Sequence, residues 1–253
     1  MKKPVKLLLA ILLVVLSGAA LVLIISPTVH ETEPQSQSEN NQMMALLDQN
    51  SAGANTEIRL PAPRLSSNVS IEEALQGRRS IRQYANKPLT LQEVSQLLWS
   101  AQGITNERGF RTAPSAGATF PLEIYLMANN VTGLSKGIYH YIPANNRLRL
   151  VHSNDVARDL TRASLGQSMV HEAGAVIIFG AVYERTTQRY GERGNRYVYN
   201  EIGHASQNVH LQAVALNLGT VVIGAFRDQE VEQILNLEPN VRVLYLMPVG
   251  KLN

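Results

Sequence analysis

The chain has no cysteine among its 253 residues, and this absence excludes several kinds of site. A disulfide scaffold, a thiolate nucleophile, a cysteine-ligated zinc or iron–sulfur centre and the lipidated cysteine of a bacterial lipoprotein are all ruled out. The net charge is also small, because 23 basic residues are nearly balanced by 20 acidic ones. Lys2, Lys3 and Lys6 supply the whole excess, so the rest of the chain is neutral and no nucleic-acid partner is expected.

No aromatic residue occurs before Tyr84, which is about a third of the way along the chain. An uncharged apolar run of 19 residues, from 7 to 25, follows the three lysines instead. A helix of this length approaches the ~30 Å of a hydrocarbon core, so residues 1–26 are predicted to be a membrane anchor with one transmembrane helix. The positive-inside rule then predicts an extracytoplasmic body. A cleaved signal peptide, which would give a secreted protein, is the alternative.

Composition changes again after the apolar run. Residues 27–57 are rich in Glu, Gln, Ser and Asn and contain no aromatic residue, so they cannot bury enough apolar area to offset the entropy of ordering. We expect a flexible polar stalk there. The remaining residues, 58–253, have a normal length for a single folded domain.

The spacing of polar and apolar residues predicts an α+β fold. Ser70 with Glu73, and Thr90 with Glu93, have the spacing of a capping box, so helices should begin there, the second ending at Gly103. Strands are expected at 122–128, 137–142, 147–151, 173–182, 220–224 and 241–247, and further helices at 155–165, 197–218 and 228–235. Several of the strands fall in hairpins instead of alternating with helices, which is typical of α+β domains.

A cluster of donor side chains follows the first predicted helix. Arg78, Arg79, Ser80 and Arg82 place three guanidinium groups and one hydroxyl within five residues. In an extended segment Ser80 and Arg82 point to one side, and arginine offers a fork of donors suited to phosphate oxygens. An arginine-rich turn can equally be solvated surface.

Two further segments could approach a flat ligand closely. Residues 111–121 are mostly small and contain two prolines, so backbone amides would be accessible and the loop shape would be restrained. Residues 220–226 end a predicted strand in Gly224 after a long helix. A plain structural loop and a buried strand with a turn glycine explain these two segments equally well.

Together, in this order, the three segments resemble the nitroreductase superfamily of FMN-dependent oxidoreductases, and most closely its SagB-type dehydrogenase branch. The matching pieces extend over most of residues 58–251. They comprise the Leu-Pro-x-Pro lead-in, Arg-Arg-Ser-Ile-Arg-Gln-Tyr from residue 78, Pro-Ser-Ala-Gly from 114, Gly-Ile-Tyr-His-Tyr from 137, Glu-Ile-Gly-His-Ala-Ser-Gln-Asn from 201 and Met-Pro-Val-Gly from 247.

The resemblance implies a mixed sheet flanked by helices and a homodimer with FMN at the subunit interface. It assigns the phosphate and the polar ring edge to Arg78, Arg79, Ser80 and Arg82, and the flavin face, from the partner subunit, to Pro114, Ser115, Ala116 and Gly117. Ile223 and Gly224 would lie near flavin N5. Lys251 would add a phosphate or ring contact, although the chain ends at Asn253 whereas many relatives continue further.

The implied chemistry belongs to the flavin, with a small molecule as substrate and NADH or NADPH as possible donor, so no catalytic side chain is expected. Family members that oxidise azolines use an adjacent Lys-Tyr pair, near the place of Arg189 and Tyr190. Arginine stays protonated and would be a poor base. A catalytically idle flavin fold that scaffolds a membrane complex is the competing function.

Glu201 and His204 have the i, i+3 spacing of di-iron carboxylate bundles. Such a site needs two motifs of this kind and further carboxylates, whereas the chain has one, so no metal site is predicted. A role at the subunit interface or beside the flavin is favoured for this pair instead.

Overall fold

The computed structural model describes residues 57–253. The predicted anchor at residues 1–26 and the stalk up to residue 56 lie outside this part. Between residues 57 and 253, no helix is both long and apolar enough to cross a bilayer.

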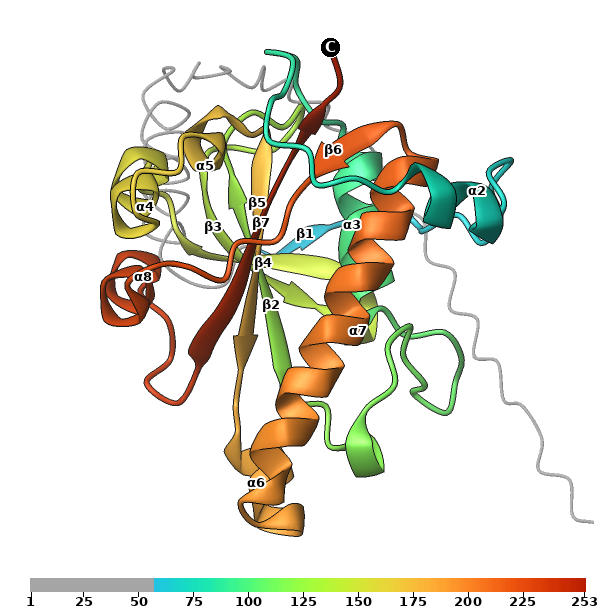
Figure 1. Cartoon of the computed structure of the whole chain (residues 1–253), viewed down its shortest axis with the longest axis vertical. Helices are drawn as coiled ribbons and strands as arrows, with labels where there is room; N and C mark the ends of the chain where they lie inside the picture. The colour runs from blue at the N-terminus through green and yellow to red at the C-terminus, as the bar shows by residue number, and fades with distance from the viewer. Residues whose placement is uncertain (1–56) are drawn as a thin grey trace, which may run out of the picture. The chain divides into compact units, whose positions relative to one another are not determined.

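A seven-stranded sheet forms the centre of the domain, and helices cover both of its faces (Figure 1). The strands are β1 (Glu57–Arg59), β2 (Leu122–Ala128), β3 (Gly137–Ile142), β4 (Arg147–His152), β5 (Ala175–Ala181), β6 (Leu218–Thr220) and β7 (Arg242–Lys251). Their spatial order is β1-β4-β3-β2-β5-β7-β6, and neighbouring strands pair antiparallel. An isolated parallel bridge joins Leu89 to Val131. The predicted α+β architecture is confirmed.

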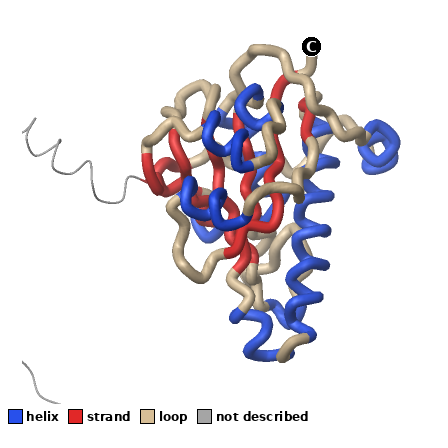
Figure 2. The backbone as a smooth tube through the Cα atoms, turned by 60° about the vertical axis from the view of Figure 1, so that its left-hand side comes forward, coloured by secondary structure: helices blue, strands red, loops and turns tan. Residues whose placement is uncertain are grey.

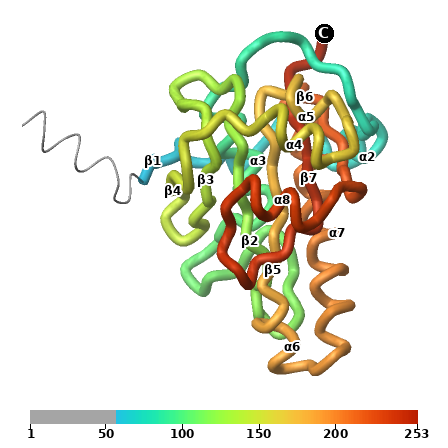
Figure 3. The backbone as a smooth tube through the Cα atoms, turned by 90° about the vertical axis from the view of Figure 1, so that its left-hand side faces the viewer, coloured from blue at the N-terminus to red at the C-terminus, as the bar shows by residue number. Residues whose placement is uncertain are grey.

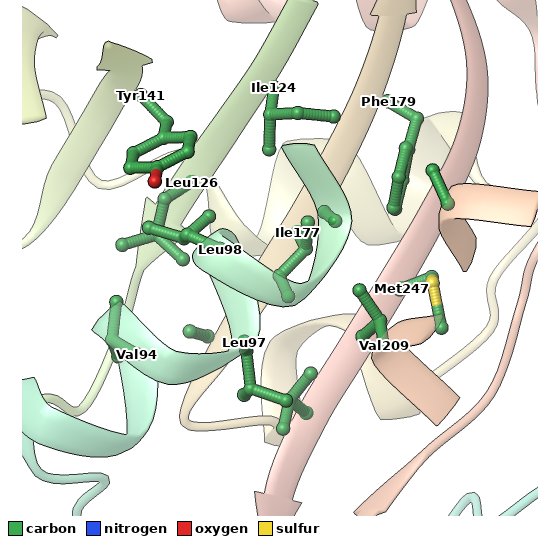
Figure 4. Packing of buried hydrophobic residues seen from close by; sticks show 14 of the residues in the cluster. Val94, Leu97, Leu98, Ile124, Leu126, Tyr141, Ile177, Phe179, Val209 and Met247 are labelled. Carbon is green, nitrogen blue, oxygen red and sulfur yellow. The ribbon is translucent and has the colours of Figure 1, made fainter. Parts of the chain in front are cut away.

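One face of the sheet packs against α3 (Leu91–Gln102) and the long helix α7 (Arg193–Ala215). Side chains alternate along a strand, so Ile177 and Phe179 of β5 point to this face and Val176 and Ile178 to the other. Figure 4 shows Leu97 and Leu98 of α3 against the β-strand side chains of this core.

The opposite face is covered by three short helices, which lie toward the viewer in Figure 3. These are α4 (Ala157–Ala163), α5 (Met169–Glu172) and α8 (Asp228–Leu235). Leu160, Val170, Val231 and Leu235 are fully buried against the sheet. The segment that follows α2 lies next to the edge of the sheet at β6.

Helix α2 (Ile71–Gly77) projects from the body of the domain (Figure 2). Its Ile71 and Leu75 side chains are 56% and 55% exposed, which is unusual for large apolar residues on one helix. Helix α6 (Glu184–Tyr190) lies at the N-terminal end of α7.

Both predicted capping boxes are present. The Ser70 and Thr90 hydroxyls accept from the Glu73 and Glu93 amides, and each glutamate accepts from the backbone of its capping residue. Helix α3 ends at Gly103 as predicted. The β3–β4 hairpin also forms at the predicted place, with a turn at Pro143–Asn145 and Asn146 in the left-handed region.

The bounds of three elements differ from the prediction. Helix α7 begins about one turn earlier than residue 197 and ends at Ala215, because Asn217, with φ of 55°, reverses the chain before Gly219. The strand predicted at 220–224 lies earlier, as β6 at Leu218–Thr220, and Ile223 makes an isolated bridge to Leu246 instead. Strand β7 continues through Pro248 instead of stopping there.

Candidate functional site

The segment from Arg78 to Ala85, here called the arginine segment, lies along the β6 edge of the sheet (Figure 1). The Ile81 amide donates to the Thr220 carbonyl at 2.9 Å, and the Ala85 amide donates to the Lys251 carbonyl at 2.9 Å. The Tyr84 hydroxyl lies 3.1 Å from the Pro248 carbonyl oxygen. These contacts fix the backbone from which the predicted phosphate ligands project.

Most donors of the arginine segment are free. Within residues 57–253, the side chains of Arg78, Ser80 and Arg82 have no hydrogen-bond or ion-pair partner. Arg79 instead folds back, and its guanidinium donates to the carbonyls of Gln76 and Arg78 at 2.9 and 2.8 Å. Two free guanidinium groups and a hydroxyl thus remain available to an anion.

A neutral histidine lies near this segment. Burial lowers the pKa of His210 on α7 to about 4, and the positive charge of Arg78 adds to this effect. The Nδ1 atom of His210 is buried and has no hydrogen-bond partner within the described chain.

Glycines allow the arginine segment to approach the sheet. A Cβ atom at Gly219 would lie 2.7 Å from Ile81, and one at Gly250 would lie 2.5 Å from the Tyr84 ring. Both distances are shorter than any ordinary carbon–carbon contact. Glycine at these two positions is what lets the segment lie flat against β6 and β7.

We therefore expect Gly250→Ala to displace Tyr84 and to lower the free energy of unfolding by about 1 to 3 kcal/mol, the usual cost of overpacking. Urea denaturation measures this. Gly203→Ala is the matched control, because nothing lies within 4 Å of a Cβ at that helical position. It should be neutral or raise stability by up to ~1 kcal/mol. Equal unfolding free energies in the two variants would contradict the packing argument.

The remaining predicted ligands of this half of the site lie beside the same edge. The Ile223 amide donates to the Leu246 carbonyl at 2.8 Å, so it is occupied. Gly224 is exposed, and within residues 57–253 its amide has no backbone partner. The Lys251 ammonium pairs with the Glu93 carboxylate, the same group that caps α3.

The second predicted half, residues 111–121, is here called the small-residue loop. Its backbone is unusual, because Gly117, Ala118 and Phe120 have φ of 59°, 53° and 45°. The Phe120 amide donates to the Ser115 hydroxyl oxygen at 2.9 Å, which closes the loop on itself. The guanidinium carbon of Arg111 lies 4.4 Å from the centre of the Phe120 ring.

Helix α6 holds this loop from outside. The Arg189 guanidinium donates to the Gly117 carbonyl at 3.1 Å, and the Thr119 and Thr186 hydroxyls are 2.8 Å apart. A Cβ atom at Gly117 would lie 2.4 Å from the Tyr190 hydroxyl. The Arg189–Tyr190 pair therefore contacts the small-residue loop directly.

A cavity of about 250 Å³ lies between this loop and α7, lined by Pro114, Ser115, Ala116, Tyr197, Asn200, Glu201 and His204. Glu201 is only 2% exposed. Burial raises the pKa of its carboxyl group to about 7, against the lowering effects of hydrogen bonds from Ser115 and Gln102 and the charge of Arg111. The sequence suggested for Glu201 a metal ligand or, more favourably, a residue at the interface or beside the flavin, but not a buried carboxyl group with a raised pKa. Its place on the buried stripe of α7, between Val198 and Ala205, is the signal that was missed.

The parts of the two predicted halves that would hold the flavin lie against different turns of α7. The small-residue loop lies beside Glu201, whereas Arg78 lies near His210. Nine residues of helix separate these two α7 positions, which corresponds to ~13 Å along the axis. Across the described residues, no group of three or more His, Asp or Glu side chains is arranged to hold a metal ion.

Sequence comparison shows related proteins across this domain. The Nitroreductase family matches residues 75–251. The Methanocaldococcus jannaschii protein MJ1384, provisionally named a nitroreductase, is 46% identical over 199 residues, which cover 79% of this chain and 98% of that protein. The microcin B17-processing protein McbC of Escherichia coli is 27% identical over 133 residues, or 51% of this chain and 49% of McbC.

Structural comparison agrees. A protein of Anabaena variabilis, also provisionally named a nitroreductase, superposes with a TM-score of 0.70 at 29% identity, over 79% of this chain and 42% of that one. The NADPH:FMN oxidoreductase of Vibrio harveyi, solved with NAD⁺, shares the fold with a TM-score of 0.53 at 19% identity, over 72% and 69% of the two chains. The chain therefore belongs to the nitroreductase family.

Proposed function

We propose that the protein is an FMN-dependent oxidoreductase that passes electrons between a reduced donor and a small acceptor. The observation that carries this proposal is the arginine segment. Its Arg78, Ser80 and Arg82 side chains, free within residues 57–253, are held at the sheet edge by the Ile81–Thr220 and Ala85–Lys251 backbone hydrogen bonds. If the arginines were merely solvated surface, no glycines would be needed to bring their backbone against the sheet. If the protein were an idle scaffold, it would have no use for free anion-binding donors.

The residues present fit FMN. Arg78, Ser80 and Arg82 offer charge-assisted and neutral donors for the phosphate and the polar ring edge, with Arg79 beside them. The Gly224 amide, not that of Ile223, is the free backbone donor for flavin N5. Lys251 would reach the cofactor only by leaving Glu93. A bound flavin supplies two-electron transfer at N5, and the protein supplies its position and electrostatics.

A second subunit completes the site in this proposal. The small-residue loop of the partner, rather than of the same chain, would lie against the flavin face, because the two halves are far apart along α7. The exposed Ile71 and Leu75 side chains of α2 provide apolar surface for such pairing.

We therefore expect a symmetric homodimer at micromolar concentration, the commonest closed assembly. Light scattering of the purified chain measures its mass directly. Ile71→Glu together with Leu75→Glu should shift the mass toward the monomer and release FMN in parallel. A monomer that still holds FMN would contradict the composite site.

The small acceptor and the nicotinamide are not assigned further. NADH or NADPH is the proposed donor, supported by the naming of the Vibrio harveyi oxidoreductase. Attachment to a membrane through residues 1–26, with the domain on the extracytoplasmic side, remains a proposal that rests on the apolar run and its lysines. Secretion after signal cleavage is its alternative.

Azoline oxidation is not part of the proposal, although the name of McbC describes processing of microcin B17. Arg189 stands where a basic catalytic residue would be needed, and its guanidinium stays protonated and is bound to the Gly117 carbonyl. A structural role in holding the small-residue loop fits these contacts.

The test of function is the redox behaviour of the FMN-loaded chain without oxygen. Addition of NADH or NADPH should bleach the visible flavin absorbance, and a quinone or nitroaromatic should restore it. If neither NADH nor NADPH bleaches the flavin, and if the acceptors do not reoxidise the flavin after a chemical reductant, the oxidoreductase assignment is wrong.

A further inference from the structure

Glu201 is a buried carboxyl group, and within residues 57–253 it has no ion-pair partner. Its Oε1 accepts a hydrogen bond from the Gln102 side-chain amide at 3.4 Å. The Arg111 guanidinium, which could have neutralised it, donates to the side-chain amide oxygen Oε1 of Gln102 at 3.0 Å instead. A carboxylate in this position would be poorly compensated, so the protonated form is favoured.

The same carboxyl group opens onto the 250 Å³ cavity beside the small-residue loop. The Ser115 hydroxyl oxygen accepts from the Phe120 amide, which leaves its own proton for Glu201. A cavity of this size holds several waters or the polar end of a small molecule. Its wall is the loop that the proposed function places on the flavin face.

Other polar groups face Glu201 from α3, α7 and the small-residue loop. Gln102 reaches it from α3, and Arg111 and Ser115 reach it from the loop. Tyr197 and His204 face the cavity from α7, and Tyr190 of α6 packs edge-on against Tyr197 at 5.0 Å. Burial raises the pKa of Glu201 to about 7, within the range suited to a general acid.

We propose that Glu201 is the proton donor of the reaction, and that its cavity seats the polar end of a two-electron acceptor. This inference rests on the proposed function. With a quinone, bound reduced FMN would supply the hydride: its N5–H bond would break as an O–H bond forms at one carbonyl oxygen. The Glu201 O–H bond breaks, its proton goes to the other oxygen, and the electron pair stays on the carboxylate. The quinone is reduced, the flavin is oxidised, and solvent returns the proton to Glu201.

The test follows reoxidation of the chemically reduced, FMN-loaded chain by menadione in stopped-flow, from about pH 5.5 to about pH 8.5. The wild-type rate should fall as pH rises through about 7, because the proton donor is then lost. Glu201→Gln should be slower at about pH 6 by on the order of 10²-fold and flat with pH. Glu184→Gln, the same change at an exposed α6 position, should match the wild type.

A second readout does not depend on turnover. The infrared spectrum of the flavin-free chain at about pH 6 should contain a protonated-carboxyl band that Glu201→Gln removes and Glu184→Gln retains. A wild-type pH profile in Glu201→Gln, or loss of its FMN, would overturn the inference while leaving the proposed function intact. A wild-type chain that binds no FMN would defeat the proposed function first, and the inference with it.

Discussion

Arg82→Ala should fold normally but purify largely without FMN. The Arg82 guanidinium is exposed, free of partners within residues 57–253, and anchored between the Ile81 and Ala85 hydrogen bonds to the sheet edge. Losing one charge-assisted contact to a bound anion costs on the order of 2 to 5 kcal/mol, or ~30-fold to several thousand-fold in affinity. Fluorescence titration with FMN measures the change.

Arg158→Ala is the matched control for this variant. Arg158 is exposed on α4, which covers the sheet face opposite to α3 and α7, and its side chain has no partner in the described chain. Arg185 would serve less well, because its guanidinium donates to the Phe120 carbonyl beside the small-residue loop. Equal FMN affinity in the Arg82 and Arg158 variants would show that the arginine segment is not the phosphate site.

The second large effect concerns stability and needs no cofactor. Glu201 titrates near pH 7 in the folded chain and near its ordinary value of 4.5 when unfolded. Because the folded pKa is raised, the folded state binds more protons between these values. Its stabilising contribution is complete below about pH 4.5 and is lost as pH rises through about 7.

Between about pH 5 and about pH 8, we expect the wild type to lose about 2 to 3 kcal/mol of unfolding free energy through this group. Glu201→Gln cannot titrate, so the stability difference between variant and wild type should change by that amount. Urea denaturation at the two pH values measures it, with Glu184→Gln as control. A constant difference would mean that Glu201 is ionised at neutral pH.

Local rules predicted much of this fold. The capping boxes at Ser70 and Thr90 depend on residues three apart, and the β3–β4 hairpin depends on its own turn, so neither needs tertiary information. The end of α7 does need it. Gly219 looked like a helix stop but serves the close approach of Ile81, while Asn217 supplies the turn.

Pro248 shows the same limit. A proline was expected to end β7, but its carbonyl faces the side where the Thr220 hydroxyl, at 2.9 Å, and Tyr84 supply the donors. Strand β6 begins to pair only at Val249, so no ladder bond is lost.

For the site, the order of the motifs named the candidate segments but could not predict the state of their groups. The pairing of Lys251 with Glu93, the occupied Ile223 amide and the raised pKa of Glu201 depend on neighbours distant in sequence. The separation of the two halves along α7 is likewise a property of the assembled domain. It fits the two-chain site that the family resemblance implied.

The most direct test of the account is the stoichiometry of FMN on the purified chain. After incubation with excess FMN and removal of free cofactor, we predict one FMN retained per chain, in particles of dimer mass. Retention of no FMN, together with no binding in a fluorescence titration, would contradict the flavin site on which the proposed function rests.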